Sequence, residues 1–205
     1  MRCKNILWAL LVYLPATGFV LPIRTERKLP SKKWVISQNS NLRVNGSTNV
    51  NTFSCVIPTY DQQDTLTIVG NTTDQTVALT GKIRLQTGSF DCHNSAMTRQ
   101  LRETLKEKQF PALYIRFLSL NKLPAATTTP ERITGLVDIE IAGINKRFDI
   151  SYQLSQDAQQ VIHLQGERII NFSDFNLVPP TKLGGIIKTK DELSVDFQLN
   201  MKALN

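Results

Sequence analysis

The sequence predicts an all-β protein with one short helix, folded as a single antiparallel β-barrel of about eight strands. Three observations support this prediction. Apolar and polar residues alternate in many short segments, one segment instead repeats its apolar residues every four positions, and a chain of 205 residues suits one sizeable domain. A two-layer β-sandwich is the alternative, because it would show the same alternation.

Alternation with period two is typical of strands that bury one face. It is clearest near the C-terminus, where every odd-numbered residue from 193 to 201 is apolar and every even-numbered residue is polar. Gly81 falls at an inward position of another alternating segment, where a barrel strand often bends. The other segments expected to form strands are 34–37, 42–48, 52–57, 65–69, 77–86, 113–117, 137–141, 148–154 and 161–170.

One segment has helical rather than strand periodicity. Met97, Leu101 and Leu105 recur every four residues, which predicts an amphipathic helix of about three turns. Asn94 or Ser95 is available as its N-cap, and Pro111 prevents its continuation. The apolar stripe is narrow, so we expect this helix to lie on the barrel as a lid.

The N-terminus is typical of a secretion signal. Arg2 and Lys4 precede an apolar run at 6–14, and small residues around Gly18 provide a cleavage site. The apolar run is well short of the roughly 20 residues that span a bilayer, which argues against an uncleaved anchor. We therefore divide the chain into a signal peptide (1–18), a basic tether (19–33) and a barrel domain (34–205), and we expect a periplasmic or secreted protein.

The positive charge of the chain is concentrated in this leader. The formal net charge is +7, but residues 34–205 contribute only +1. Binding to duplex nucleic acid requires clustered positive charge, so we expect no nucleic-acid partner. The tether would allow peripheral membrane contact at most, and the sequence does not indicate an oligomeric state.

Two cysteines remain after removal of the signal peptide, which carries Cys3. In an oxidising compartment, Cys55 and Cys92 are candidates for a disulfide that closes a loop of 37 residues. The alternative is two separate buried thiols that behave as small hydrophobic residues.

Groups suited to catalysis are scarce. The chain has two histidines; His93 is adjacent to Cys92, and His163 stands at an outward position. Neighbouring side chains on a strand point to opposite faces, so Cys92 and His93 do not form a nucleophile–base pair by adjacency alone. Asp138 and Glu140 share the polar face of one segment, where solvation is the simpler interpretation. We expect no metal site, no cofactor and no enzymatic activity, although a redox-active Cys92 at the helix start is a third hypothesis.

Several stretches, in this order and spacing, resemble the YceI-like family. The resemblance covers essentially residues 34–204. One departure lies in the hairpin at 142–146, Ala-Gly-Ile-Asn-Lys, where the family more often has a basic residue before the glycine and a threonine before the lysine. The stretches that carry the resemblance are Trp34-Val35-Ile36 with 40–55, Asp91-Cys92-His93 with 94–113, Thr134-Gly135-Leu136 with 137–146, and Asn171-Phe172-Ser173 with 174–177 and the last strand.

The resemblance implies a lipocalin-like barrel, located in the periplasm, with an interior suited to a long polyisoprenoid chain. It therefore favours a binding or carrier protein for an apolar, isoprenoid-like lipid. The alternative is a structural or protein-interaction module with a filled barrel, because alternation does not distinguish a hollow interior from a packed one. Gly46 and Gly81, small residues at inward positions, favour open space. The inward residues expected to line the cavity are Phe53, Leu79, Ile83, Leu85, Leu113, Ile115, Phe117, Ile139, Phe148, Ile150, Tyr152 and Phe197.

Overall fold

The computed structural model describes residues 31–70, 76–125 and 127–204. The segment expected to be a signal peptide (1–18) and residues 19–30 of the expected tether lie outside this range. The first strand begins at Ser31, so residues 31–33, expected in the tether, are already part of the sheet.

The described chain contains eleven strands, one α-helix and three short 3-10 helices. None of its helices has the length and apolar character needed to cross a bilayer. The strands are β1 (Ser31–Ile36), β2 (Asn41–Thr48), β3 (Thr52–Ile57), β4 (Thr65–Val69), β5 (Val77–Gln86), β6 (Ala112–Leu120), β7 (Glu131–Ile141), β8 (Ile144–Gln156), β9 (Val161–Asn171), β10 (Thr181–Lys182) and β11 (Ile187–Leu204), and the helices are α1 (Ser95–Thr104), η1 (Thr87–Ser89), η2 (Phe172–Phe175) and η3 (Leu183–Gly185).

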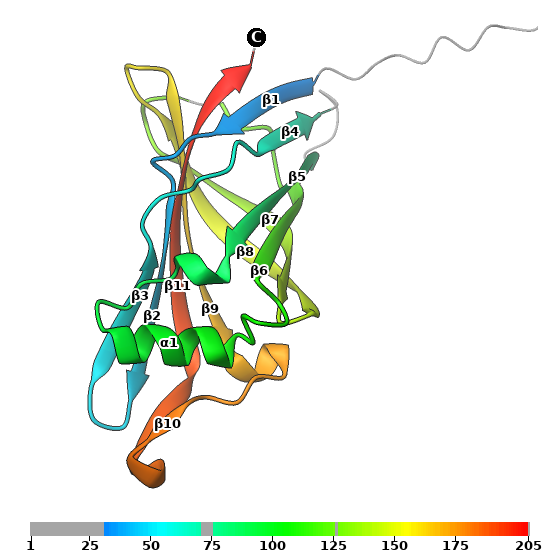
Figure 1. Cartoon of the computed structure of the whole chain (residues 1–205). Helices are drawn as coiled ribbons and strands as arrows, with labels where there is room; N and C mark the ends of the chain where they lie inside the picture. The colour runs from blue at the N-terminus through cyan, green and yellow to red at the C-terminus, as the bar shows by residue number, and fades with distance from the viewer. Residues whose placement is uncertain (1–30, 71–75, 126, 205) are drawn as a thin grey trace, which may run out of the picture.

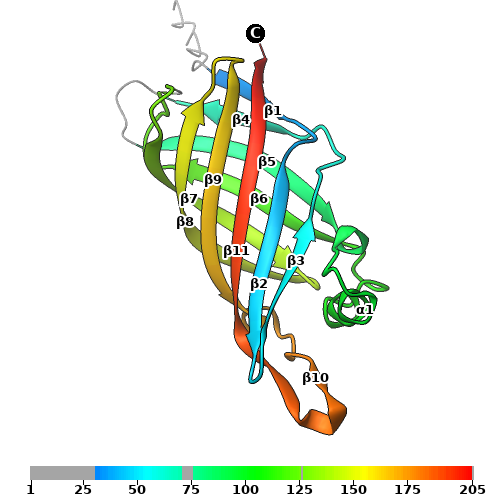
Figure 2. The same ribbon diagram turned by 90° about the vertical axis from the view of Figure 1, so that its left-hand side faces the viewer.

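Eight of the strands close into an antiparallel barrel. Their order is β1-β4-β5-β6-β7-β8-β9-β11, and pairing between β1 and β11 completes the ring. Strands β2 and β3 extend the sheet from β11, and the short β10 pairs with β11 at one end of the molecule (Figures 1 and 2). The predicted antiparallel barrel with one helix is confirmed.

One edge of strand β11 pairs with two strands in succession, while its other edge pairs with β9. Its residues 201–204 pair with β1, and its residues 189–198 pair with β2. Asn200 stabilises the crossing of the chain between these partners: its side-chain amide donates to Asn39 O at 2.8 Å, and its backbone N–H donates to Ser40 Oγ at 2.9 Å. Asn200 is therefore buried, although it stands at a polar, outward position of its strand.

The barrel interior is built from the inward positions of all these strands. In β8 and β9, buried apolar residues alternate with polar ones, as the sequence predicts. Irregularities of register interrupt β5 between Ala78 and Gly81 and β6 between Phe117 and Ser119, and these bends allow the sheet to curl. After the second one, inward positions in β6 change from odd to even residue numbers.

Candidate functional site

An apolar cavity lies inside the barrel. Its walls come from β2, β3, β5–β9 and β11, and from the α1 and η2 regions. The free volume is about 100 Å³, smaller than the roughly 300–1,000 Å³ typical of ligand pockets. A bound chain would therefore be slender, or it would displace some of the lining side chains.

Nine of the twelve residues expected at the cavity line it, and three lie elsewhere. Leu79 is fully buried in the part of the barrel closed by β4, and Phe148 packs against Phe175 with ring centroids 6.1 Å apart. Phe53 is partly buried and rests on Gly46 of the neighbouring strand. The nine lining residues are Ile83, Leu85, Leu113, Ile115, Phe117, Ile139, Ile150, Tyr152 and Phe197. Contact of any of them with a ligand stays a prediction.

Several lining residues were absent from the expected set. Val137, Ile141 and Val195 stand at inward positions of strands already recognised, so alternation was sufficient to find them. The helix residues Leu101 and Leu105 also line the cavity, as a lid would. By contrast, Phe90, Phe172, Phe175 and Leu177 lie in or beside 3-10 helices, where no strand periodicity marks the inward side.

Gly46 and Gly81 do not leave open space, contrary to the expectation from their size. A Cβ atom on Gly46 would lie 2.3 Å from the Phe53 ring, and one on Gly81 would lie 2.5 Å from Leu66. Neighbouring strands supply these large side chains, so the volume beside each glycine is filled. The same arrangement occurs at Gly166, which is covered by the Phe197 ring.

Among the described residues, Arg168 is the one charged residue that lines the cavity. It stands at an inward position of β9, opposite Val195 of β11, and its guanidinium carbon lies 5.3 Å from the centre of the Phe148 ring. Its Nε atom is buried without a hydrogen-bond partner, and within residues 31–70, 76–125 and 127–204 it forms no ion pair. An unpaired cation beside an apolar space can bind a negatively charged or polar group of a ligand.

Tyr152 contributes a second unpaired polar group. Its hydroxyl is buried and has no hydrogen-bond partner in the described part of the chain, while its ring packs edge-on against Phe197 at 5.7 Å. Burial raises the pKa of the Tyr152 phenol above its usual value, so the hydroxyl is neutral near pH 7.

The helix closes a seam in one half of the barrel. Among the described residues, β3 pairs with no strand other than β2, and β5 pairs with β4 only through residues 78–80. Residues 87–105 fill the resulting space: Val56 and Asp91 exchange backbone hydrogen bonds of 2.7 and 2.8 Å beside the Cys55–Cys92 disulfide. The predicted disulfide is therefore present in the structure.

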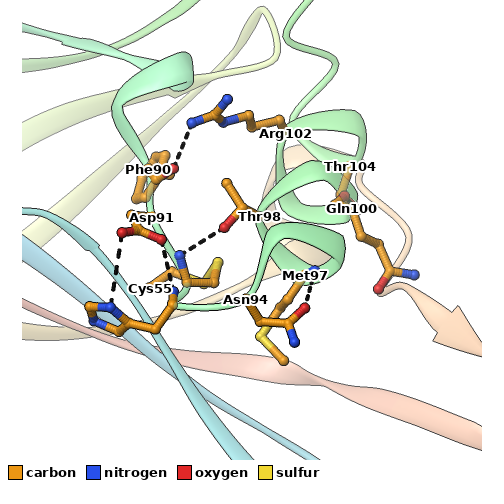
Figure 3. Close-up of a disulfide and its surroundings, with 11 residues drawn as sticks. Cys55, Phe90, Asp91, Asn94, Met97, Thr98, Gln100, Arg102 and Thr104 are labelled. Carbon is orange, nitrogen blue, oxygen red and sulfur yellow. Dashed lines mark hydrogen bonds and ion pairs between the residues drawn. A yellow bond between two sulfur atoms is a disulfide. The ribbon is translucent and has the colours of Figure 1, made fainter.

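Figure 3 shows how α1 is attached to this seam. Asn94 is the N-cap, because its Oδ1 accepts a hydrogen bond from Met97 N at 3.0 Å. Thr98 Oγ1 accepts from Cys92 N at 3.0 Å, and Arg102 Nη2 donates to Phe90 O at 2.9 Å. These contacts position the buried face of the helix over the cavity.

Two titratable groups considered in the sequence, Asp138 and His163, have structural partners outside the cavity. Asp138 pairs with Arg147 on the outer face, and this hydrogen bond holds the pKa of the Asp138 carboxyl below its usual value. An outward position predicts that His163 faces solvent, but its ring has two side-chain partners. Asn200 Oδ1 lies 2.7 Å from its Nδ1, and Asp157 Oδ2 lies 3.0 Å from its Nε2. Within the described ranges, no three His, Cys, Asp or Glu side chains converge as a metal site would require.

Comparison with solved structures identifies the fold. BcnA from Burkholderia cenocepacia matches with a TM-score of 0.58 and 14% identity, over 78% of this chain and 95% of the other. A protein from Saccharophagus degradans, described as a polyisoprenoid binding domain implicated in plant cell wall breakdown, matches with a TM-score of 0.56 and 13% identity, over 83% of this chain and 98% of the other. The Campylobacter jejuni YceI protein matches with a TM-score of 0.51 and 14% identity, over 76% of this chain and 84% of the other.

The chain has the YceI-like fold. The resemblance seen in the sequence is thereby supported at the level of three-dimensional structure. No protein-family model matches the sequence, and no curated protein matches it. At identities of 13–14%, the comparison identifies the YceI-like fold and leaves the ligand to be argued from the cavity itself.

Replacement of Tyr152 by Phe tests whether the cavity leaves this hydroxyl unpaired. We expect the free energy of unfolding to stay the same or to increase by about 1 kcal/mol, because an unpaired buried polar atom is removed. Urea unfolding of the purified protein measures this change. A loss of more than about 1 kcal/mol would show that the hydroxyl has a partner, such as a bound water or ligand.

The double variant Cys55→Ala/Cys92→Ala tests the seam. We expect a loss of about 3–4 kcal/mol in the free energy of unfolding, because the disulfide closes a loop of 37 residues. Urea unfolding of the variant and of the oxidised and reduced wild type provides the comparison. A loss below about 1 kcal/mol would mean that the Val56–Asp91 bridge and the helix contacts close the seam alone.

Proposed function

We propose that this protein binds one long apolar ligand inside its barrel and carries it in the periplasm or outside the cell. The observation that supports this most strongly is the cavity. Apolar side chains make up most of its lining, and only a few polar groups are among them. Apolar space inside a closed sheet is favourable for a hydrocarbon chain and unfavourable for water.

Three further observations support the proposal. The Saccharophagus degradans protein with the same fold is described as a polyisoprenoid binding domain, which makes an isoprenoid-like lipid the first ligand to test. The disulfide is compatible with an oxidising compartment, as is the signal peptide expected from the sequence. The partial exposure of inward Ile115, Val195 and Phe197 supports an interior that is incompletely packed.

The small free volume favours a second candidate, a barrel that is filled by its own side chains and acts through its surface. Native mass spectrometry of protein purified without detergent distinguishes the two candidates. A discrete added mass, released by organic solvent, would support the carrier and identify its cargo. An unchanged protein mass after incubation with polyprenols of increasing chain length would support the filled barrel.

Arg168 gives the proposed ligand an orientation. Arg168 and the polar side chain of Asn171 lie toward the same end of β9, and no other charged residue lines the cavity in the described part of the chain. A ligand with an anionic or polar head would place the head at Arg168 and its chain along the apolar interior.

The variant Ile115→Trp tests the cavity directly. We expect the affinity for the added lipid to fall about tenfold or more, because the indole ring fills the space that a ligand needs. Tyr114→Trp is the matched control, since it enlarges the neighbouring side chain, which lies beneath Lys82 on the outer face. Binding is measured by native mass spectrometry, and thermal unfolding monitors folding. Undiminished binding by a folded Ile115→Trp protein would contradict the cavity model.

The variant Arg168→Met tests the orientation. We expect it to weaken the binding of geranylgeranyl phosphate by about tenfold to a hundredfold, because charge-assisted hydrogen bonds are lost, and to leave geranylgeraniol binding nearly unchanged. Arg132→Gln, on the outer face of β7, removes an exposed charge as a control. Equal losses for the phosphate and the alcohol would show that Arg168 acts through packing alone.

A further inference from the structure

Exposed hydrophobic side chains gather at one end of the molecule. Seven large hydrophobic residues are exposed among the described residues, and four of them lie in two segments: Val50 in the β2–β3 turn, and Val178, Leu183 and Ile186 in residues 178–190. The last three are 82%, 70% and 72% exposed. We call these two segments, 49–51 and 178–190, the tip.

The tip is one connected surface. Asn49 Nδ2 donates to Ile186 O at 2.9 Å, and Asn49 Oδ1 accepts from Lys188 N at 2.9 Å, so the turn is bonded to the loop. Pairing of β10 with β11 orders the two sides of the loop. In Figures 1 and 2 the tip projects beyond the barrel, at the end opposite the C-terminus and below α1.

The charge of the tip has one sign. Residues 178–190 contain Lys182, Lys188 and Lys190 and no acidic residue. The side chains of Lys188 and Lys190 are exposed. The next acidic residue, Asp191, accepts a hydrogen bond from Ser173 N at 2.9 Å and a second from the Ser173 hydroxyl.

Leu183 is placed at some conformational cost. Its φ angle is 52°, in the left-handed region that disfavours a bulky side chain, and its side chain is mostly exposed, so burial compensates little for this. Such a residue is better explained by a contact with something outside the chain than by the stability of the fold.

The tip adjoins the cavity. Leu177 lines the cavity, and the next residue in the chain, Val178, is exposed at the tip. Gln100 Nε2 of α1 donates to Thr181 O at 3.2 Å, which connects the helix over the seam to the same loop.

We propose that the tip is a docking surface for an anionic lipid bilayer. The apolar side chains of Val50, Leu183 and Ile186 enter the boundary between head groups and acyl chains, and the lysines attract the negatively charged head groups. Apolar side chains beside clustered lysines are the combination that binds such a surface. This inference goes beyond the proposed function, because a barrel without a ligand would dock equally well.

The experiment uses tryptophan reporters, because a retained leader could bind vesicles by itself. Ile186→Trp reports from the tip, and Leu204→Trp reports from an exposed position at the opposite end. With vesicles of equal parts phosphatidylglycerol and phosphatidylcholine, we expect a blue shift of the Ile186→Trp emission and none for Leu204→Trp. The shift should be weaker with phosphatidylcholine alone and should decrease with added salt.

Matched variants test each component in vesicle flotation. We expect Leu183→Ser/Ile186→Ser to reduce the fraction bound to anionic vesicles about tenfold, and the control Leu123→Ser/Leu204→Ser to leave it unchanged. Lys188→Gln/Lys190→Gln should reduce binding and its salt dependence, whereas Lys32→Gln/Lys33→Gln, in the exposed part of β1, should not.

Three results would overturn the proposal. The first is no binding of the wild-type protein to anionic vesicles, and the second is equal binding by the tip variants and their controls. The third is a wild-type dimer, seen by light scattering, that the Leu183→Ser/Ile186→Ser variant converts to a monomer without any vesicle binding; the tip would then contact a second copy of the chain.

Discussion

The architecture depends on the double pairing of β11. Because one edge of this strand is shared between β1 and β2, the barrel ring closes through β1 in one half of the molecule, and β2 and β3 extend beside it in the other. Residues 37–40 connect β1 to β2, and at this point the partner of β11 changes from one to the other. The buried Asn200 satisfies backbone groups that this crossing would otherwise leave unpaired. The seam between β3 and β5 is a direct consequence of this arrangement.

The seam decides which part of the barrel can be hollow. Where β4 pairs with β1 and β5, the interior holds fully buried residues such as Leu66 and Leu79. Where the helix replaces a strand, Leu101 and Leu105 reach the interior from outside the sheet, and the cavity lies beneath them. A helix attached by a disulfide and a few hydrogen bonds can move more easily than a paired strand, so this wall is the one best able to admit a ligand wider than the resting cavity.

Alternation in the sequence was sufficient to predict ten of the eleven strands, the barrel and nine of the residues that line the cavity, because one buried face per strand imposes a period of two. It was insufficient where a residue's surroundings depend on register. The small size of Gly46 predicts open space, yet its cross-strand partner Phe53 fills that space. Asn200 stands on the polar parity of its strand, yet the crossing of β1 into β2 buries it. Arg168 shares the inward parity of Ile162 and Leu164, so alternation alone places it inside the barrel, although charged residues are rarely found in an apolar interior.

The end of the cavity that holds Arg168 and the tip face the same way. Strand β9 runs toward the tip, so Arg168 and Asn171 lie nearer to it than Ile162 and Leu164 do. A ligand with an anionic head bound at Arg168 would keep that head near the end that docks on a membrane, with its chain directed into the barrel. Entry with the chain first would take the apolar part out of the bilayer directly into apolar surroundings, and the head would leave water only at the last step. Since transfer of a charged group through an apolar interior is costly, this order of entry is the one that the placement of Arg168 favours.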